Sequence, residues 1–380
     1  MKKKRNNKIG IITFHASYNC GSMLQAFALQ NVLEKKYNND VEIIHYSNFG
    51  QRNYYANWDF FPKPSILKNN IKSLGKYSEI NKMKKDYDEF SDIFLNKSGK
   101  MIKHRNKLND KNYDIVIAGG DQVWNVRCRD ADRAYFLSFV KNAKRVAYSP
   151  SLGARNINTE CLKPQIYKEL LKKFDYLSVR EKNGQKWIKE LTGLDVPIIA
   201  DPTLLLSKNE WINNLQLKST GIKENFILFY AFYYNNEENN KILMDLSKKL
   251  NMPIYIIDRK SYYINKLDKY GIKIYKKSGP IGLLELMNEA NLVLVQSFHG
   301  IIFSTLFHKN FWSMRNKTIK NPNDDRAKCI LEQLGLEDRT MIYDNLLTSD
   351  LYKEINYEEV DRKTEELRKI AFKYIEDFLK

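Results

Sequence analysis

The stretch VLVQSFHGIIFS, residues 293–304, joins a strand pattern directly to a helix pattern. The apolar run at 292–297 is typical of a buried strand, and the run that starts at Gly300 has the spacing of a helix. His299 lies at the junction. Ligands of open parallel sheets bind just beyond the carboxyl ends of the strands. The junction therefore predicts an α/β fold with a functional site at this position.

The same alternation of short apolar strands and amphipathic helices runs through the rest of the chain. KIGIITF at 8–14, a helical stretch after Ser22 and VEIIHY at 41–46 form a βαβ opening. Further strands are predicted at 114–121, 144–153, 176–181, 197–206, 226–232, 253–258 and 310–314.

This alternation predicts parallel sheets with helices on both faces. Because a second series of strands begins at 226, we expect two Rossmann-like domains, 1–210 and 222–380, with a cleft between them. The C-terminal segment has the spacing of an amphipathic helix. A chain of 380 residues is also long enough for two cores.

The formal net charge of +18 favours an anionic partner. Residues 63–107 hold twelve Lys and Arg against five Asp and Glu, and the first eight residues add five more bases. We expect a basic helical insertion at about 50–110 between strands of the first domain. No recognised nucleic-acid-binding motif is present, so we do not expect a nucleic-acid partner.

Cysteine usage and hydropathy favour a cytoplasmic protein. The four cysteines, at 20, 128, 161 and 329, are scattered, and they form no metal-ligand spacing with the five histidines. We therefore expect reduced thiols and no metal site. No apolar run is long enough to span a bilayer, and the run after the basic start is too short for a secretory signal.

Unusual polar residues and glycines gather where predicted strands end. They are Gly119, Gly120, Asp121, Ser149, Arg180, Asp201 and His299. Each has a structural alternative: the glycines can form a turn, Arg180 can pair with Glu181, and Asp201 can begin a turn at Pro202. Their joint position at strand ends favours a shared site.

Two features of this predicted site suit an anionic ligand. The helix that starts near Ser22 presents free backbone N–H groups, although Ser22 can also be a simple N-cap. The helix start at His299 disfavours an imidazolium, whereas a bound phosphate dianion favours it. His299 is then charged when an anionic substrate arrives, which suits a general acid, and Gly300 leaves room for a ligand or for backbone to approach.

Five motifs occur together in a fixed order. They are NCGSMLQAFALQ at 19–30, AGGDQVWN at 118–125, YLSVRE at 176–181, ADPTLLL at 200–206 and SFHGIIFS at 297–304. The first is similar to NYGxxLQAxAL and the second to GSDQVWN, which are motifs of the polysaccharide pyruvyl transferases. The chain resembles this family over nearly its whole length.

The resemblance implies a GT-B-like fold and a reaction. In that reaction the enolpyruvyl carbons of phosphoenolpyruvate pass to two hydroxyls of a sugar, giving a pyruvate ketal and phosphate. His299 matches the family's catalytic acid, and Asp121 and Asp201 are candidates to orient or deprotonate the acceptor. Some members carry an arginine at the position of Ser297, so Arg180, Arg315 and Arg326 are candidates to hold the donor here. The reaction requires neither a metal nor a cofactor.

The remaining predicted substrate-binding residues come from the same motifs. With Arg180, Arg315 and Arg326, the set is Asn19, Gly21, Ser22, Gly119, Gly120, Gln122, Ser149, Ser297 and Gly300. The resemblance also implies an acceptor that belongs to a cell-surface polysaccharide or its lipid-linked precursor. The basic segment at 63–107 would then contact the anionic inner face of the cell membrane.

Two alternatives remain open at the level of sequence. One is a GT-B-type glycosyltransferase that uses a nucleotide-sugar donor, and the other is a non-catalytic glycan-binding relative. Release of phosphate indicates a pyruvyl transferase, and release of nucleotide indicates a glycosyltransferase. Release of neither indicates the glycan-binding relative.

Overall fold

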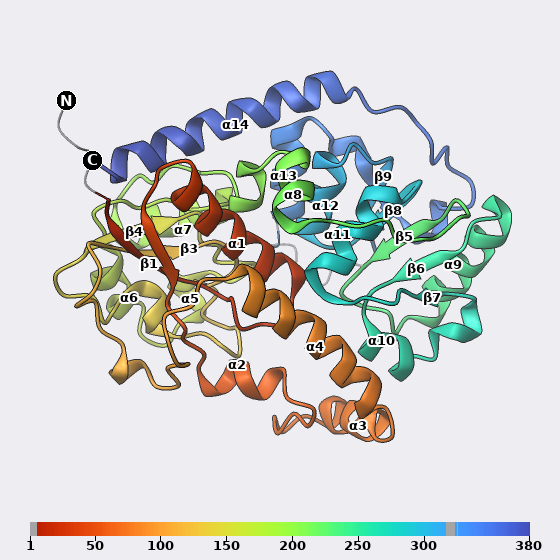
Figure 1. Cartoon of the computed structure of the whole chain (residues 1–380), viewed down its shortest axis with the longest axis horizontal. Coiled ribbons are helices and arrows are strands. Elements are labelled where there is room, and N and C mark those ends of the chain that lie inside the picture. The colour runs from red at the N-terminus through yellow and green to blue at the C-terminus, as the bar shows by residue number, and fades with distance from the viewer. Residues whose placement is uncertain (1–5, 317–323, 325) are drawn as a thin grey trace.

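The computed structural model describes residues 6–316, 324 and 326–380. Within these residues the strands form two sheets, one on each side of the molecule in Figure 1, and every neighbouring pair of strands is parallel. This confirms the predicted α/β fold with two Rossmann-like domains. The division into 1–210 and 222–380 stays a prediction.

The first sheet has the strand order β2-β1-β3-β4. Its strands are β1 (Lys8–Ile12), β2 (Asp40–Ile43), β3 (Ile115–Gly119) and β4 (Lys144–Tyr148). The chain runs outward from β1 to β2 and then resumes on the other side at β3. The loops after β1 and β3 therefore diverge, which leaves a ligand position at the carboxyl ends of these two strands.

Helix α1 (Cys20–Lys35) follows β1 and lies between the two domains (Figure 1). Its residues from Cys20 to Leu33 are all buried. An ordinary surface helix has one polar face, so burial on all sides marks α1 as a helix packed from both directions. The helix begins at Cys20 with Asn19 as its N-cap, so Ser22 is not the cap that the sequence suggested.

The insertion after β2 contains three helices, α2 (Phe49–Tyr54), α3 (Pro64–Ser73) and α4 (Tyr77–Phe94). The predicted helical segment extended to about 110, but the helices end at Phe94. Beyond that point the chain lies beside β2 and makes isolated parallel bridges at Lys97 and Ile102. The physical reason is that the buried residues of α4 recur at helical spacing only as far as Phe90.

Two of the predicted strands are shorter than expected. Residues 176–181 and 197–201 contribute only single parallel bridges, at Tyr176, Val179 and Ile198, beside β4. Pro197 has no backbone N–H, which limits a regular ladder at this edge. The helices between β4 and the end of this domain are α5 (Ile157–Glu160), α6 (Pro164–Leu171) and α7 (Lys182–Thr192).

The second sheet has the order β10-β9-β8-β5-β6-β7. Its strands are β5 (Ile227–Tyr230), β6 (Ile254–Ile256), β7 (Lys273–Ile274), β8 (Leu292–Val295), β9 (Phe311–Arg315) and β10 (Thr340–Ile342). Its helices are α9 (Glu237–Leu250), α10 (Arg259–Ile264), α11 (Gly279–Glu289), α12 (Phe298–Leu306) and α13 (Arg326–Leu334). The strand order reverses between β5 and β8, so their carboxyl ends mark the ligand position of this sheet.

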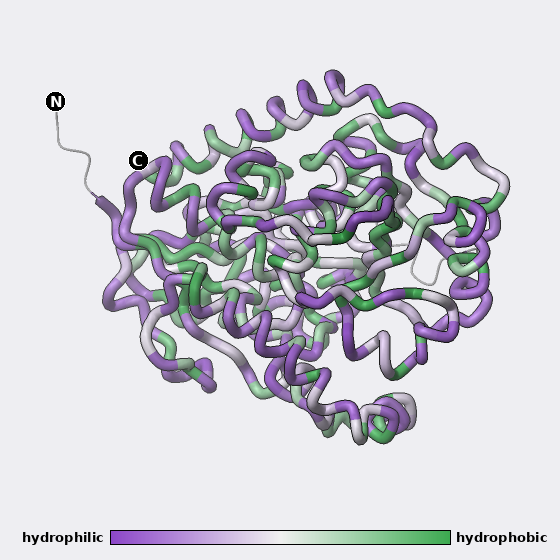
Figure 2. Tube along the Cα trace, turned by 45° about the vertical axis from the view of Figure 1, so that its right-hand side comes forward, coloured by the Kyte–Doolittle hydropathy of each residue, from purple (hydrophilic) through white to green (hydrophobic). Residues whose placement is uncertain are grey.

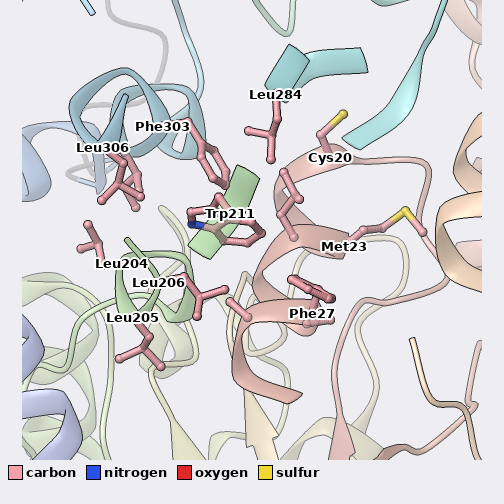
Figure 3. Close-up of a cluster of buried hydrophobic side chains, with 14 of the residues drawn as sticks. Cys20, Met23, Phe27, Leu204, Leu205, Leu206, Trp211, Leu284, Phe303 and Leu306 are labelled. Atoms are coloured by element: carbon pink, nitrogen blue, oxygen red, sulfur yellow. The ribbon is translucent and has the colours of Figure 1, made fainter. Parts of the chain in front are cut away.

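A continuous apolar cluster joins the two domains (Figure 3). Trp211 of α8 (Lys208–Leu215) lies between Phe27 of α1 and Phe303 of α12, with ring centroids 5.7 Å and 5.1 Å away. Its indole N–H donates a hydrogen bond to the Thr203 carbonyl at 3.3 Å. Because this core contains residues of both halves, the domains share buried apolar surface.

The last helix, α14 (Tyr357–Phe378), crosses from the second domain to the first, along the top of Figure 1. The Tyr374 hydroxyl donates to the Ala147 carbonyl of β4 at 2.9 Å, and the Lys144 ammonium donates to the Phe378 carbonyl at 2.9 Å. The amphipathic C-terminal helix that the sequence predicted thus packs across the join.

Within the described residues, no helix combines the length and apolarity needed to cross a membrane. The same residues contain no group of three or more His, Cys, Asp or Glu side chains placed to hold a metal ion. None of the four cysteines forms a disulfide bond among the described residues, and burial raises the pKa of the Cys20 thiol to about 12.

We expect Trp211→Ala to lower the free energy of unfolding by about 3–5 kcal/mol, because it empties the shared core and removes a buried hydrogen bond. Urea denaturation followed by far-UV circular dichroism measures this. Leu162→Ala, at a side chain that is 99% exposed, is the control and should change the value by less than about 0.5 kcal/mol. A loss below about 1 kcal/mol for Trp211→Ala would contradict the shared core.

Candidate functional site

His299 lies where β8 ends and α12 begins, at the reversal point of the second sheet. Ser297 caps the helix, and its hydroxyl accepts a hydrogen bond from the Gly300 backbone N–H at 3.4 Å. A Cβ atom at Gly300 would lie 2.9 Å from a Val295 methyl and 3.1 Å from the Tyr230 ring. The missing side chain therefore makes room for the Val295 and Tyr230 side chains of the protein itself.

His299 faces Asp201 of the first domain. Its Nε2 atom lies 3.5 Å from an Asp201 carboxylate oxygen. The other oxygen, Oδ1, accepts hydrogen bonds from the Thr203 N–H at 3.0 Å and the Thr203 hydroxyl at 2.7 Å, at the start of η3 (Pro202–Leu205). Burial acts to raise the pKa of Asp201, but His299, Arg180 and the Thr203 N–H together lower it well below its usual range. Asp201 is therefore an ionised carboxylate that links the two domains.

Arg180 binds the same carboxylate oxygen that faces His299. Its Nη1 atom donates to Asp201 Oδ2 at 2.7 Å, and its guanidinium lies 4.2 Å from the centre of the Phe298 ring. The carboxylates of Asp121 and Glu181 lie at 3.9 Å and 3.6 Å. Arg180 is buried, and its Nε and Nη2 atoms have no hydrogen-bond partner among the described residues. Such orphaned N–H groups are rare in a protein interior and fit an oxygen-rich ligand.

Gly21, in the first turn of α1, lies directly against the His299 ring. A Cβ atom at this position would be 2.1 Å from His299 Nδ1. No side chain fits there without moving the ring, so the motif requires glycine. With only 6% of its surface exposed, His299 is enclosed between the start of α1 and Asp201.

The loop after β3, where the strand order of the first sheet reverses, also contributes to the site around Arg180. Asp121, just after β3, has a φ of 50°, and its carboxylate accepts a hydrogen bond from the Ser22 hydroxyl. Gly120 has a φ of 62°, and a Cβ atom there would lie 1.6 Å from Gln25 Oε1. Both the left-handed backbone and the close approach require glycine. The structure thus brings Ser22 and Asp121 next to a charged cluster. This cluster, called the Arg180 cluster below, consists of Arg180, Glu181, Asp201 and His299.

Gln25 is a site-shaping residue that our sequence reasoning missed. Its amide donates hydrogen bonds to the Thr13 hydroxyl at 2.8 Å and the Ser22 carbonyl at 2.7 Å, so it ties the loop after β1 to α1. The side chain is fully buried. A signal was present in the motif LQAFALQ, because a glutamine on an otherwise apolar buried helix needs polar partners.

Several predicted residues have structural contacts instead of facing His299. The set is Asn19, Gly119, Gln122 and Ser149. Asn19 accepts from the Ser22 N–H at 3.3 Å, and Gly119 lies within β3. Gln122 accepts from the Asn125 amide at 3.1 Å, and the buried Ser149 hydroxyl donates to the Ile199 carbonyl at 2.9 Å.

The two candidate arginines of the second domain, Arg315 and Arg326, differ in how closely they approach the Arg180 cluster. Arg326 forms a two-pronged ion pair with Asp324, at 2.8 Å and 2.6 Å. Burial acts to lower the pKa of Arg326, but Asp324 in contact, with Glu181 and Asp121 farther away, raises it above its usual range. Arg326 therefore lies within electrostatic reach of the Arg180 cluster. Arg315 ends β9, and its charge acts on Asp324, the residue that pairs with Arg326.

A cavity of about 350 Å³ opens beside this cluster, between the two domains. Asn19 and Cys20 from the first domain and Tyr230 from the second form part of its wall. Cys20 is followed by Gly21, which touches His299, and Tyr230 packs on Gly300.

Comparison with known proteins finds one matching family. The family model described as polysaccharide pyruvyl transferase matches residues 19–318, which is most of the chain. No curated protein matches the chain.

Two solved structures show the fold alone, because their sequence identity is low. A putative UDP-N-acetylglucosamine 2-epimerase from Listeria monocytogenes has a TM-score of 0.51 at 13% identity, covering 95% of this chain and 91% of that one. UDP-GlcNAc 2-epimerase from Methanocaldococcus jannaschii, in complex with UDP-GlcNAc and UDP, has a TM-score of 0.50 at 14% identity, with coverages of 95% and 92%. The fold is therefore GT-B-like, as predicted.

We expect Asp201→Asn to lower the free energy of unfolding at pH 7 by about 3–5 kcal/mol, because Arg180 loses its buried counter-charge. The folded pKa of Asp201 lies below the unfolded value of about 3.9, so its stabilisation is complete above that pH and is lost as the pH falls toward the folded pKa. The difference between wild type and variant should therefore shrink in acid.

Urea denaturation at pH 7, 4 and 3 measures this trend. Asp245→Asn, at an exposed aspartate of α9, is the control and should leave the free energy unchanged within about 0.5 kcal/mol. A difference for Asp201→Asn that stays constant or grows in acid would show that the carboxylate is not held ionised.

Proposed function

The chain belongs to the polysaccharide pyruvyl transferase family, and from that premise we propose that it transfers a pyruvyl group from phosphoenolpyruvate to two hydroxyls of one sugar. The product is a cyclic pyruvate ketal in a cell-surface polysaccharide or its precursor, and phosphate is released. The main support is the buried Arg180, whose free N–H groups lie next to the Asp201–His299 pair. A cation and an imidazole at one place suit an enol phosphate.

We propose that cationic side chains from both domains bind the negatively charged groups of the donor. Phosphoenolpyruvate carries a phosphate and a carboxylate, and three protein carboxylates already lie within 4 Å of Arg180. Arg180 alone therefore cannot balance the donor. Arg326 and Arg315 of the second domain supply the further positive charge in this proposal, which replaces the arginine that some family members have at position 297.

The proposed reaction needs one proton donor and one acceptor. His299 protonates the methylene carbon of phosphoenolpyruvate, which makes C2 electrophilic, and the first sugar hydroxyl adds to C2 as it loses its proton. The second hydroxyl then attacks C2, the bond from C2 to the phosphate oxygen breaks, and phosphate leaves. Of the two hydroxyl protons, one replaces the proton given to the methyl group and the other leaves with phosphate.

The two aspartates receive different parts in this scheme. A carboxylate with a strongly lowered pKa is a weak base, so Asp201 is proposed to orient His299. Asp121 is not tied to the imidazole, and its Oδ2 already accepts a hydrogen bond from the Ser22 hydroxyl. Asp121 is therefore proposed to accept the hydrogen bond of a sugar hydroxyl and to assist its deprotonation.

A nucleotide-sugar donor is the alternative, because one solved structure of this fold holds UDP-GlcNAc and UDP. Incubation of the chain and a panel of acceptor glycans with phosphoenolpyruvate, UDP-sugars or GDP-sugars separates the possibilities. Release of phosphate and a ketal mass gain support the proposal. Nucleotide release indicates a glycosyltransferase, and the absence of both products indicates a non-catalytic glycan-binding protein.

We expect His299→Gln to lower the turnover number for phosphate release by roughly two to four orders of magnitude, because general acid catalysis typically contributes that much. His308→Gln, at an exposed histidine that pairs with Asp361, is the matched control and should keep wild-type turnover. Circular dichroism confirms that both variants fold. Near-normal turnover of His299→Gln would remove this residue from the mechanism.

A membrane-facing role for α3 is proposed on the basis of its exposed surface. Leu67, Ile71 and Leu74 are more than half exposed and recur on one helical face, and Phe60 nearby is 73% exposed. Residues 60–78 contain four lysines and no acidic residue. Figure 1 shows α3 at the periphery, and Figure 2 shows that the segment mixes hydrophobic and hydrophilic residues. Such a surface suits an anionic lipid headgroup layer. The bases at 2–5 lie outside the described residues.

We expect the double variant Leu67→Ser, Ile71→Ser to bind vesicles containing about one third phosphatidylglycerol at least tenfold more weakly, because two apolar side chains no longer insert. Vesicle sedimentation at two salt concentrations measures the affinity. Ile93→Ser, at an exposed isoleucine of α4, is the control and should bind like wild type. Equal binding of the wild type to neutral vesicles would refute the membrane role.

A further inference from the structure

The 350 Å³ cavity has an aromatic wall built by the insertion. Tyr18 contacts Tyr55 and Tyr87, each with ring centroids 5.6 Å apart, and Tyr54 contacts Tyr55 at 4.8 Å. The second domain contributes Tyr230, Phe232 and Tyr234 at the end of β5. Rings that hold one another in edge contacts are already ordered, so they present an apolar surface at little entropic cost.

Two lysines give this aromatic cavity a positive charge. Lys84 of α4 and Lys260 of α10 both line it, and no ion pair among the described residues includes either. The Lys84 ammonium donates to the Asn57 side-chain oxygen at 2.6 Å and lies 5.5 Å from the centre of the Tyr18 ring. Burial, and secondly the charge of Lys260, lower the pKa of Lys84 to about 8. The two ammonium groups therefore repel one another across a partly dry space, which an anion would relieve.

The two acidic side chains of the cavity are already engaged. Asp59 forms a two-pronged ion pair with Arg129, at 2.5 Å and 2.6 Å. Asp258 accepts from the Ser261 N–H at 2.9 Å and the Ser261 hydroxyl at 2.7 Å, as the N-cap of α10. The Asp59 charge is thus paired with Arg129, whereas Asp258 has only neutral partners among the described residues, so the two lysines leave the cavity with an excess of positive charge.

The cavity also lies at the right place for the proposed reaction. Cys20 and Tyr230 are in its wall. Gly21, which follows Cys20, contacts the His299 ring, and Tyr230 packs against Gly300, which follows His299. The Cys20 sulfur lies 3.2 Å from the Tyr87 hydroxyl, so the aromatic wall continues up to the start of α1. A sugar ring on this wall would lie beside Cys20, and the next residue, Gly21, contacts the His299 ring.

We propose that this cavity is the acceptor subsite and that the acceptor sugar carries an anionic substituent, a phosphate or a carboxylate. The proposal rests on the proposed function, because it assigns the sugar of that reaction to a place. The aromatic wall takes the apolar face of the sugar ring, and Lys84 and Lys260 bind the anion. A partner sugar without charge would leave the two lysines unpaired.

The test measures binding to the full chain without phosphoenolpyruvate, so its outcome is independent of whether pyruvyl transfer occurs. The probes are hexose 1-phosphates, hexuronates and free hexoses of the gluco, galacto and manno series, titrated by calorimetry. We expect at least one charged probe to bind tenfold or more tightly than its free hexose, and the better of the two charged classes identifies the anion.

Variants then place the ligand. Lys84→Gln and Lys260→Gln should each weaken the charged probe by about tenfold and leave the free hexose unchanged, whereas Tyr54→Ala should weaken both. Lys84→Arg should restore binding of the charged probe. Lys85→Gln, at the exposed neighbouring lysine of α4, is the control and should bind like wild type.

Three results would overturn the proposal. One is equal affinity for charged and free hexoses across the panel, including no binding of either. Another is an effect of Lys85→Gln as large as that of Lys84→Gln. The third is competition by phosphoenolpyruvate for the charged probe, since that would make the cavity the donor's site. Phosphate release in the separate activity assay tests the proposed function whichever result is found.

Discussion

The buried carboxylate of Asp201 is the constraint on which the site depends. An ionised carboxylate in a protein interior is unfavourable unless cations and hydrogen bonds compensate for lost water. Here Arg180 and Thr203 come from the first domain and His299 from the second, so the compensation requires both domains in one arrangement. The ionic contact and the apolar cluster around Trp211 therefore stabilise the same relative placement of the domains.

The sheet topologies explain why this contact forms at that place. The strand order reverses between β1 and β3 in one sheet and between β5 and β8 in the other. Loops diverge at such points and leave room at the carboxyl ends. Asp121 follows β3 and His299 follows β8, and Arg180 lies between them. Two generic ligand positions thus become a single composite site. The insertion adds α3, which turns Asn69 and Asn70 toward the cavity and Leu67 and Ile71 toward solvent.

Much of the fold and of the candidate site was predictable from the pattern of residues. The predictions were incomplete where a residue's contact partner is distant in sequence. The motif at 297–304 predicted His299 at a strand end, and the structure places it there. The sequence left open whether a ligand or the protein itself approaches Gly300, and in the structure Val295 and Tyr230 occupy the space that the missing side chain leaves. Gly21 was in the predicted set without its reason, which is contact with a histidine 278 residues later in the chain. Residues 176–181 have β-type composition, yet they form only single bridges, to Val146 on one side and to Ile198 on the other, where Pro197 has no N–H to extend the ladder.

The sequence by itself determined the local elements, their parallel arrangement and the short list of chemically active side chains. These follow from periodicity, from backbone preferences and from the rule that ligands bind at strand ends, all of which act over a few residues. Only the tertiary structure decided that Arg180 pairs with Asp201 before it can meet a ligand, and that Lys84 and Lys260 face one another in an aromatic cavity. Charge interactions and desolvation depend on distances across the domain join, and no local pattern in the chain encodes those distances.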